Sequence, residues 1–223
     1  MDTPLYSAVD LGNAISFGPY KKGFKLEVPL SFQTPRMYIP FGLSKFAADF
    51  GDRWNLDFSL EGHPKFVEFL RRVDEYVIRH IHRHHDAIFG CKMTIEDIKK
   101  SYTSNLKPSS NPERYAPTFR VKVDDTHFYD AEGNLLFEEE GETKDERGFK
   151  GLQGIGIFEL SSVYFFNKRM GCTWKAEQIK IIPASDNNNK RQKISHDDDG
   201  PPGAGDEEVT EGGGITSFAF RGL

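Results

Sequence analysis

The stretch Val163–Ile182, VYFFNKRMGCTWKAEQIKII, decides the expected fold. It is predicted to form two β-strands joined by a basic turn. Aromatic and basic side chains are interleaved along it: Tyr164, Phe165, Phe166 and Trp174 with Lys168, Arg169, Lys175 and Lys180. Aromatic faces stack on bases and cations contact phosphates, so this mixture on one sheet surface is typical of a groove for a single-stranded nucleic acid. An ordinary amphipathic hairpin with its aromatic residues in the core explains the same pattern.

The composition indicates one substantial domain with a real core. The chain has 223 residues, of which 13% are aromatic and 19 are Phe. It has no run of about 18 apolar residues, which argues against a membrane-spanning helix, and its first residues lack the basic-then-apolar pattern of a secretory signal. The two cysteines, Cys91 and Cys172, lie far apart without a CxxC partner. This favours a reducing compartment over a disulfide framework or a zinc knuckle.

The net charge of −5 hides an asymmetry. The residues from Ala184 onward include eight acidic and four basic ones, which leaves 25 basic and 26 acidic residues in the first 183. A binding surface for an anion must therefore come from local clustering. One cluster is Lys99–Lys122, which has six basic residues, one acidic residue (Glu113) and the aromatic residues Tyr102, Tyr115 and Phe119.

Hydrophobic periodicity predicts a mainly β chain with one long helix. Pro64–Phe89 carries apolar residues at helical spacing, with Pro64 suited to the first turn and Gly90 to the stop. A short helix is expected over Thr94–Lys100, where Thr94 and Asp97 form a variant of the capping box. Strands are expected at 25–32, 36–41, 54–60 and 118–123, in a hairpin over 127–137, and in the closing pair of strands that ends near 182.

This order predicts an oligonucleotide-binding (OB) fold, a five-stranded Greek-key barrel, with the long helix inserted between strands 3 and 4. The domain is expected to span residues 1–183. Residues 184–223 have almost no apolar content and are expected to form a disordered acidic, Gly-rich tail.

No set of residues points to catalysis, a cofactor or a metal. His80 and His84 have the i, i+4 spacing of zinc ligands, but Arg83 stands between them and would repel a metal. The histidines are better explained as a solvated basic helix end, where the helix dipole favours cations. Gly154 and Gly156 lack the third glycine and the following helix of a dinucleotide site. The sequence thus indicates a protein that is not an enzyme.

Three segments carry a resemblance to a known family: IPFGLSKF (Ile39–Phe46), YAPTFRVKV (Tyr115–Val123) and FNKRMGCTWKAEQIKI (Phe166–Ile181). With the long helix between the first two, they resemble the phage-type single-stranded DNA-binding proteins of podoviruses, and especially their relatives in large DNA viruses of eukaryotes. The resemblance covers Lys25–Ile182. It implies an OB barrel that coats single-stranded DNA during viral DNA replication, recombination and repair, often as a homodimer.

The resemblance and the local composition together predict the nucleic-acid-binding residues. By position, Arg120 and Lys122 match the family's basic strand and Lys168, Arg169, Trp174 and Lys175 match its closing strands, while Lys45 and Phe46 match its second-strand motif. Tyr115 and Tyr164 are added because they lie among these cations. Bases are expected to stack on Trp174, Tyr164 and Tyr115, and phosphates to meet Arg120, Lys122, Lys168, Arg169 and Lys175.

Family members typically end in an acidic tail with a terminal aromatic residue, which can occupy the groove or recruit replication partners such as DNA polymerase. Here the acidic stretch Asp197–Glu211 is followed by ITSFAFRGL, so Phe218 and Phe220 are not terminal and Arg221 intrudes. The run Lys190–Lys193, KRQK, fits either a nuclear import signal or a solubilising charge pair. The expected location is the infected host cell, in the nucleus or at a viral replication site.

Two other functions fit the same residues. In the first, the chain is a viral structural or scaffolding protein whose OB-like barrel serves protein contacts, so that the basic strands face a partner. In the second, the ligand is RNA, because a stacking groove does not by itself distinguish the sugars.

Overall fold

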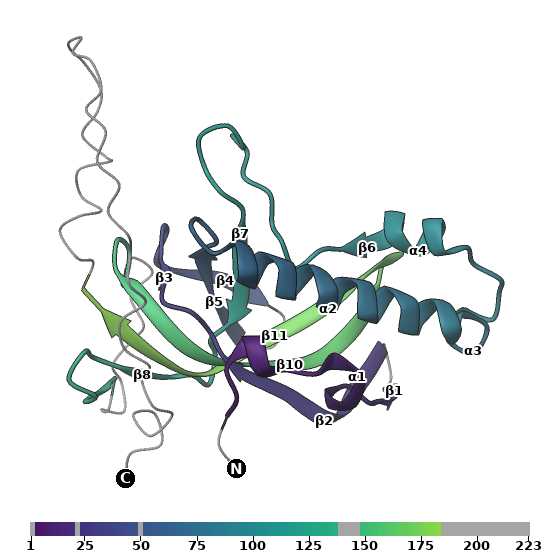
Figure 1. Ribbon diagram of the computed structural model, residues 1–223, viewed down its shortest axis with the longest axis horizontal. Coiled ribbons are helices and arrows are strands. Elements are labelled where there is room, and N and C mark those ends of the chain that lie inside the picture. The colour runs from purple at the N-terminus through teal and green to yellow at the C-terminus, as the bar shows by residue number, and fades with distance from the viewer. Residues whose placement is uncertain (1–2, 21–22, 49–50, 138–147, 184–223) are drawn as a thin grey trace.

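The computed structural model describes residues 3–20, 23–48, 51–137 and 148–183 (Figure 1). The predicted tail, residues 184–223, and the predicted acidic loop, residues 138–147, lie outside the described residues. No helix within the described part has both the length and the apolar character needed to cross a membrane.

The described chain is mainly β with one long helix, as predicted. The helical segments are η1 (Tyr6–Ala8), α1 (Leu11–Ala14), α2 (Pro64–Arg83), α3 (His85–Phe89) and α4 (Ile95–Ser101). The strands are β1 (Phe17–Tyr20), β2 (Gly23–Gln33), β3 (Met37–Tyr38), β4 (Leu43–Ala48), β5 (Gly51–Ser59), β6 (Tyr102–Thr103), β7 (Thr118–Lys122), β8 (His127–Tyr129), β9 (Leu135–Leu136), β10 (Gln153–Phe166) and β11 (Arg169–Ile182).

The strands close into a barrel because β3 and β4 act together as one bent strand. β3 pairs with β10, and the bend continues this pairing through hydrogen bonds from Ile39 N to Leu152 O and from Leu43 N to Gly148 O. β4 then pairs with β5, β5 with β7, β7 with β11, and β11 with β10. Five strands in this Greek-key order form the barrel architecture of the OB fold.

The position of the long helix differs from the prediction in one respect. Along the chain, α2 does follow the third predicted strand. Within the closed barrel, however, α2 lies between the second strand, β5, and the third, β7. The reason is that β2 pairs with β1 and with one edge of β10, and so is an added strand outside the barrel circuit.

Aromatic residues link the helix to the barrel core. Phe66 and Phe69 of α2 are buried, and the ring of Phe66 lies 6.0 Å from Phe32 and 5.9 Å from Phe119. In Figure 1, α2 crosses above the curved surface formed by β10 and β11. A helix whose apolar stripe meets the inner face of a sheet buries both surfaces at once, which fixes the barrel beneath it.

The ends of the helices follow local signals in the sequence. The predicted helix over 64–89 is divided at His84 into α2 and α3, and α3 ends at Gly90, whose φ of +65° suits glycine. The capping box of α4 is present, because Asp97 N donates to Thr94 Oγ1 and Thr94 N donates to Asp97 Oδ2.

Candidate nucleic-acid interface

The outer face of β7 carries the basic residues that the sequence predicted for it. Phe119 and Val121 point into the core and are at most 1% exposed, whereas Arg120 and Lys122 are exposed on the opposite side. Alternation along a strand places successive side chains on opposite faces. Both predicted cations of β7 therefore lie on the outside of the barrel.

Neighbouring strands extend this face. Lys122 lies opposite Lys175 of β11 and opposite Asn55 of β5, and Arg120 lies opposite Asp57. The structure thus brings together Arg120 and Lys122 of β7 and Lys175 of β11, two strands that are far apart in the sequence. In an OB fold, the face of the second and third barrel strands and the loop between the fourth and fifth are the usual places where oligonucleotides bind.

Lys122 is held among charges of both signs. Burial lowers the pKa of the Lys122 ammonium, Asp124 raises it, and Arg53 and Lys175 lower it further. Asp124 is itself engaged, because Arg53 Nη1 lies 3.4 Å from its Oδ2 and Trp54 N donates to its Oδ1 at 2.7 Å. A phosphate placed here would offset the repulsion between the cations.

Arg120 is paired with a buried carboxylate. Its Nε donates to Asp57 Oδ1 at 2.7 Å and its Nη2 donates to Asp57 Oδ2 at 2.8 Å. Lys107 Nζ lies 3.4 Å from the same Oδ2. The hydrogen bonds to Asp57 raise the pKa of Arg120 more than burial lowers it.

The turn between β10 and β11 extends the basic face with aromatic groups. Its two residues, Asn167 and Lys168, have φ values of 48° and 62°, which is the geometry of a two-residue hairpin turn. Phe166 before the turn is 61% exposed, and Arg169 after it is exposed. Arg169 and Lys175 are six residues apart on β11, so the face is about 20 Å long.

Tyr164 lies on the same outer side of the hairpin, across from Gly171. A Cβ at Gly171 would meet the Tyr164 hydroxyl at 2.8 Å, so the absence of a side chain there lets the tyrosine lie over β11. The predicted residues Tyr164, Lys168 and Arg169 thus share one end of the face.

Acidic residues border this surface on its β10 side. Glu159 lies opposite Lys175, and Glu177 accepts a hydrogen bond from Ser31 Oγ at 2.9 Å. The basic surface therefore runs along β11 toward the turn.

The remaining predicted residues lie elsewhere on the barrel. Lys45 is exposed, with its Nζ 5.7 Å from the ring centre of Trp54, and the side chain of Phe46 lies outside the described part. Tyr115 is 56% exposed on a loop closed at its base by two hydrogen bonds between Lys107 and Thr118, and the guanidinium of Arg114 lies 5.4 Å from its ring. Tyr115 is thus available to a ligand.

The prediction that bases stack on Trp174 is wrong, because this residue is buried in the core. It is 3% exposed, and its ring lies 5.6 Å from Phe32 and 5.4 Å from Phe119 in the core. Its indole Nε1 donates to Asn105 Oδ1 at 2.7 Å. A ring enclosed on both sides has no face for a base, so Trp174 is removed from the interface.

Asn105 belongs to a buried polar network centred on Asp74 of α2. The Asp74 carboxylate accepts hydrogen bonds from Tyr102 Oη at 2.8 Å, Ser104 Oγ at 2.7 Å and Asn105 Nδ2 at 2.7 Å. Burial raises the pKa of Asp74, and these hydrogen bonds oppose that rise. The network ties the segment after α4 to both α2 and β11, which fixes the start of the loop that carries Tyr115.

The last turn of α2 is basic, as predicted, with His80, His82 and the exposed Arg83, but His80 is partly buried and not solvated. The ring of His80 lies 4.2 Å from Phe17 and 4.6 Å from His84. Burial, with smaller contributions from His84 and Arg83, lowers the pKa of His80 to about 4. No group of three His, Cys, Asp or Glu side chains within the described ranges could hold a metal ion.

This lowered pKa predicts acid sensitivity. Because unfolded His80 takes up a proton near pH 6.5 and folded His80 only near pH 4, the free energy of unfolding should fall as the pH drops through this window. We expect His80→Gln to flatten that fall and His82→Gln to leave it as in the parent protein. Urea unfolding at pH 7.5, 6 and 5 measures the free energy of unfolding at each pH. If this free energy falls equally with pH in the parent and in His80→Gln, the prediction is contradicted.

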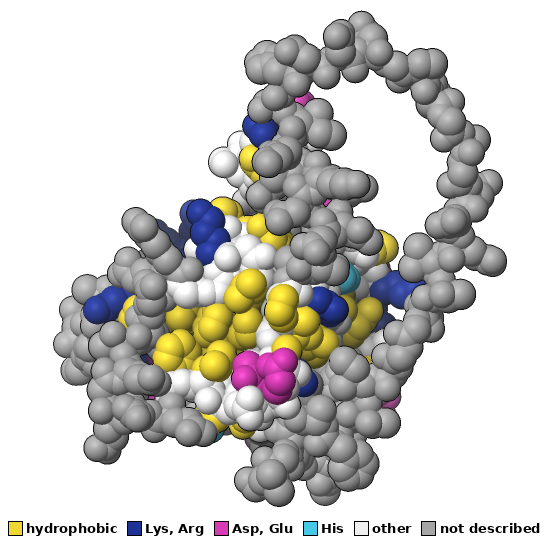
Figure 2. Space-filling model, turned by 90° about the vertical axis from the view of Figure 1, so that its left-hand side faces the viewer, with side chains coloured by type: hydrophobic (Ala, Val, Ile, Leu, Met, Phe, Trp, Pro, Cys, Tyr) yellow, Lys and Arg dark blue, Asp and Glu magenta, His cyan; other side chains and the backbone are white. Residues whose placement is uncertain are grey.

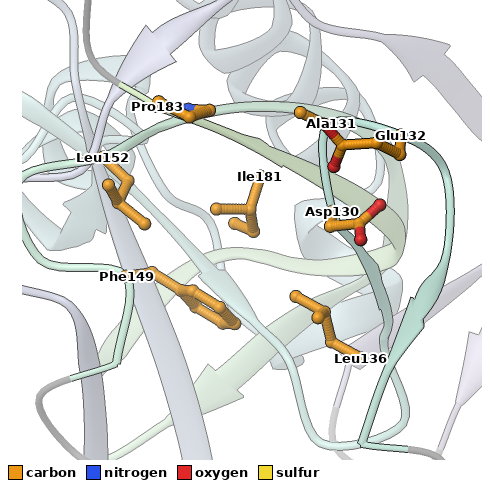
Figure 3. A pocket seen from close by; sticks show the side chains of 8 residues that line it. All are labelled: Asp130, Ala131, Glu132, Leu136, Phe149, Leu152, Ile181 and Pro183. Carbon is orange, nitrogen blue, oxygen red and sulfur yellow. The ribbon is translucent and has the colours of Figure 1, made fainter.

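A small cavity lies away from the basic face. It has a volume of about 260 Å³ and is lined by Asp130, Ala131, Glu132, Leu136, Phe149, Leu152, Ile181 and Pro183 (Figure 3). Figure 2, a view of the left-hand side of Figure 1, shows hydrophobic side chains gathered beside acidic ones on the face where β8 and the end of β11 lie. Ile181 is twelve residues from Arg169 along β11, so the two lie at opposite ends of this strand, which is at most about 40 Å long between them. An apolar hollow with an acidic rim does not suit a polyanion.

The sequence prediction missed Arg53 and Asp57, and it named Phe166 among the interleaved aromatic residues without including it in the predicted binding residues. Asp57 occupies a polar position of an alternating strand, and because Asp is depleted in strands its presence there was a usable signal. Phe166 directly precedes the two-residue turn, a position at which an aromatic side chain meets solvent.

Neither the protein-family models nor the curated protein sequences contain a match to this chain. Among solved structures, the chain is similar to gp2.5, a single-stranded DNA-binding protein encoded by bacteriophage T7, with a TM-score of 0.45 and 11% identity over 75% of this chain and 98% of that one. The single-stranded DNA-binding protein of bacteriophage Enc34, in complex with single-stranded DNA, matches with a TM-score of 0.42 and 8% identity over 78% and 97% of the two chains. The C-terminal truncation of the Enc34 protein matches with a TM-score of 0.43 and 8% identity over 79% of this chain and 98% of that one.

Proposed function

We propose that this protein binds single-stranded DNA on the outer face of β5, β7 and β11 and at the β10–β11 turn. The proposal rests on one observation: Lys122, Lys175 and Arg169 share one face of an OB barrel with the exposed ring of Phe166 and the partly buried ring of Tyr164. Within the described residues, no ion pair engages Lys122 or Lys175, so both can meet phosphates. Stacking and phosphate contacts together give tight binding with little sequence preference.

The test is fluorescence anisotropy of a labelled oligo-dT of about thirty nucleotides, compared with duplex DNA and RNA of equal length over a salt series; this length exceeds the roughly 4–16 nucleotides that one OB fold covers. We expect tight binding to the single strand that weakens steeply as salt rises. Equal affinity for duplex DNA would contradict the proposed ligand. Preference for RNA would support the RNA alternative, and no binding at low salt would support the structural or scaffolding alternative.

Phe166 provides a prediction with a closely matched control. Replacing Phe166 by Ala should weaken binding by about 1–3 kcal/mol, the usual contribution of one base–aromatic stack. Phe41, at the bend between β3 and β4, is also 61% exposed, but β3 pairs with the start of β10, at the opposite end of that strand from Phe166. Phe41→Ala should therefore bind like the parent. The same anisotropy assay compares them, and equal losses for both variants would remove Phe166 from the interface.

The wider role that we propose is coating of single-stranded DNA during viral replication, recombination and repair, as a homodimer and without a catalytic step. Contacts with replication proteins such as DNA polymerase through residues 184–223, and nuclear import through Lys190–Lys193, belong to the same proposal. They rest on the resemblance in sequence.

A further inference from the structure

Arg120 and Lys122 stand two residues apart on the same face, yet their charges are balanced differently. The Asp57 carboxylate is 6% exposed and takes two hydrogen bonds from Arg120, whose side chain is 46% exposed. A phosphate that approached Arg120 would meet a guanidinium already paired with a fixed negative charge. Coulomb repulsion from Asp57 would offset much of the attraction.

Lys122 has no carboxylate opposite it on the neighbouring strands, and the carboxylate near it, Asp124, is held by Arg53 and by Trp54 N. The partner of Lys122 on β5 is the neutral Asn55, and its partner on β11 is another cation, Lys175. Glu159 lies opposite Lys175 on β10, but within the described residues no ion pair joins Lys122 or Lys175 to a carboxylate, whereas Arg120 is bound directly to Asp57. The two lysines are therefore better placed than Arg120 to attract a phosphate. A single strand of DNA, in which phosphates and bases alternate, would therefore meet two different kinds of site on this face: the Asp57–Arg120 pair and the two lysines.

Resting on the proposed function, we infer that the Asp57–Arg120 pair is a platform for a base, whereas Lys122 and Lys175 hold the phosphates. A fork-shaped pair between a guanidinium and a carboxylate has a fixed, planar geometry. Guanidinium planes stack on bases in single-stranded nucleic acids. Two of the five N–H groups of Arg120 are used by Asp57, and the three that remain lie in the plane of the guanidinium, where they can reach a base beside the stacked one.

Lys107 is a second cation beside the Asp57 carboxylate. Its Nζ lies 3.4 Å from Asp57 Oδ2, at the base of the loop that carries Tyr115. Asp57 is thus held by two cations, and the plane of Arg120 is fixed before any ligand arrives. Such fixation lowers the entropy lost when a base stacks on it.

The two roles differ in their dependence on salt. Each phosphate that a cation neutralises on a single strand contributes about −0.7 to the slope of log K against log salt. Lys122→Gln should therefore make the slope shallower by about 0.7. Arg120→Lys keeps the charge but loses the plane, so it should bind about tenfold more weakly with an unchanged slope. Asp57→Asn releases the charge of Arg120 and should steepen the slope by about 0.7.

The experiment measures the affinity of the parent protein and these three variants for oligo-dT at four or five salt concentrations, with thermal unfolding to show that each is folded. Arg120→Lys with the parent's affinity would overturn the inference, and a lower melting temperature in that variant would assign the pair to structure alone. An unchanged slope in Asp57→Asn or in Lys122→Gln would also overturn it. Failure of the parent to bind would instead reject the proposed function itself.

Discussion

Reversal of charge at Lys122 is expected to weaken binding of single-stranded DNA about a hundredfold. The change removes a charge-assisted contact to phosphate, which contributes about 1.5–3 kcal/mol. It also places a carboxylate beside Arg53 and Lys175, the two cations that now lower the pKa of Lys122, and so neutralises charge that the phosphates would otherwise meet. The lost phosphate contact and the neutralised charge together reduce the binding free energy by about 2–3 kcal/mol, which weakens the affinity about a hundredfold.

The fold should tolerate Lys122→Glu, because the side chain lies on the exposed face of β7. Lys65→Glu is the matched control: it makes the same change of charge on the exposed side of α2 and should bind like the parent. Anisotropy with oligo-dT at fixed salt compares the two. If both variants bind equally well, Lys122 is not at the interface, and if only Lys122→Glu loses protein assembly, the scaffolding alternative gains support.

Trp174→Ala is expected to destabilise the fold by about 3–5 kcal/mol, as is usual for a buried large aromatic residue. The residue is 3% exposed and contacts Phe32 and Phe119, so its removal leaves a cavity at the centre of the barrel. It also leaves Asn105 Oδ1 without the hydrogen bond from the indole, which adds the cost of an unpaired buried acceptor. Such a loss is a large part of the stability of a typical domain.

Urea unfolding followed by circular dichroism measures this loss. Tyr164→Ala is the control, because Tyr164 lies on the outer side of the same hairpin and its removal should change the free energy of unfolding far less. Trp174→Ala with the stability of the parent but without binding would show that the indole contacts the ligand. That result would restore the role predicted from the sequence.

The local features of the fold could be predicted from the sequence because short-range interactions determine them. The capping box at Thr94, the stop at Gly90 and the alternation of β7 each depend on a few adjacent residues, and each is confirmed. The place of β2 could not be predicted in this way. Whether a strand joins the barrel or its edge depends on which residues distant in sequence pair with it.

The error at Trp174 had a signal in the sequence. Met170, Cys172, Trp174 and Ala176 form one apolar row in β11, and Arg169, Gly171, Thr173, Lys175 and Glu177 form the other. Period-two alternation places Trp174 with the core row. The Asp57–Arg120 pair, in contrast, joins residues 63 positions apart, and only the register of β5 with β7 brings them together.

Single-stranded DNA is expected to lie on the outer face of β5, β7 and β11 and at the β10–β11 turn. Photo-crosslinking of an oligonucleotide that carries halogenated deoxyuridine, with the modified residues identified by mass spectrometry, tests this most directly. We expect crosslinks at the aromatic residues on the outer side of that face, the exposed Phe166 and the partly buried Tyr164, and at Tyr115. Crosslinks confined to Tyr129 and Phe149, near the acidic cavity, would contradict the claim.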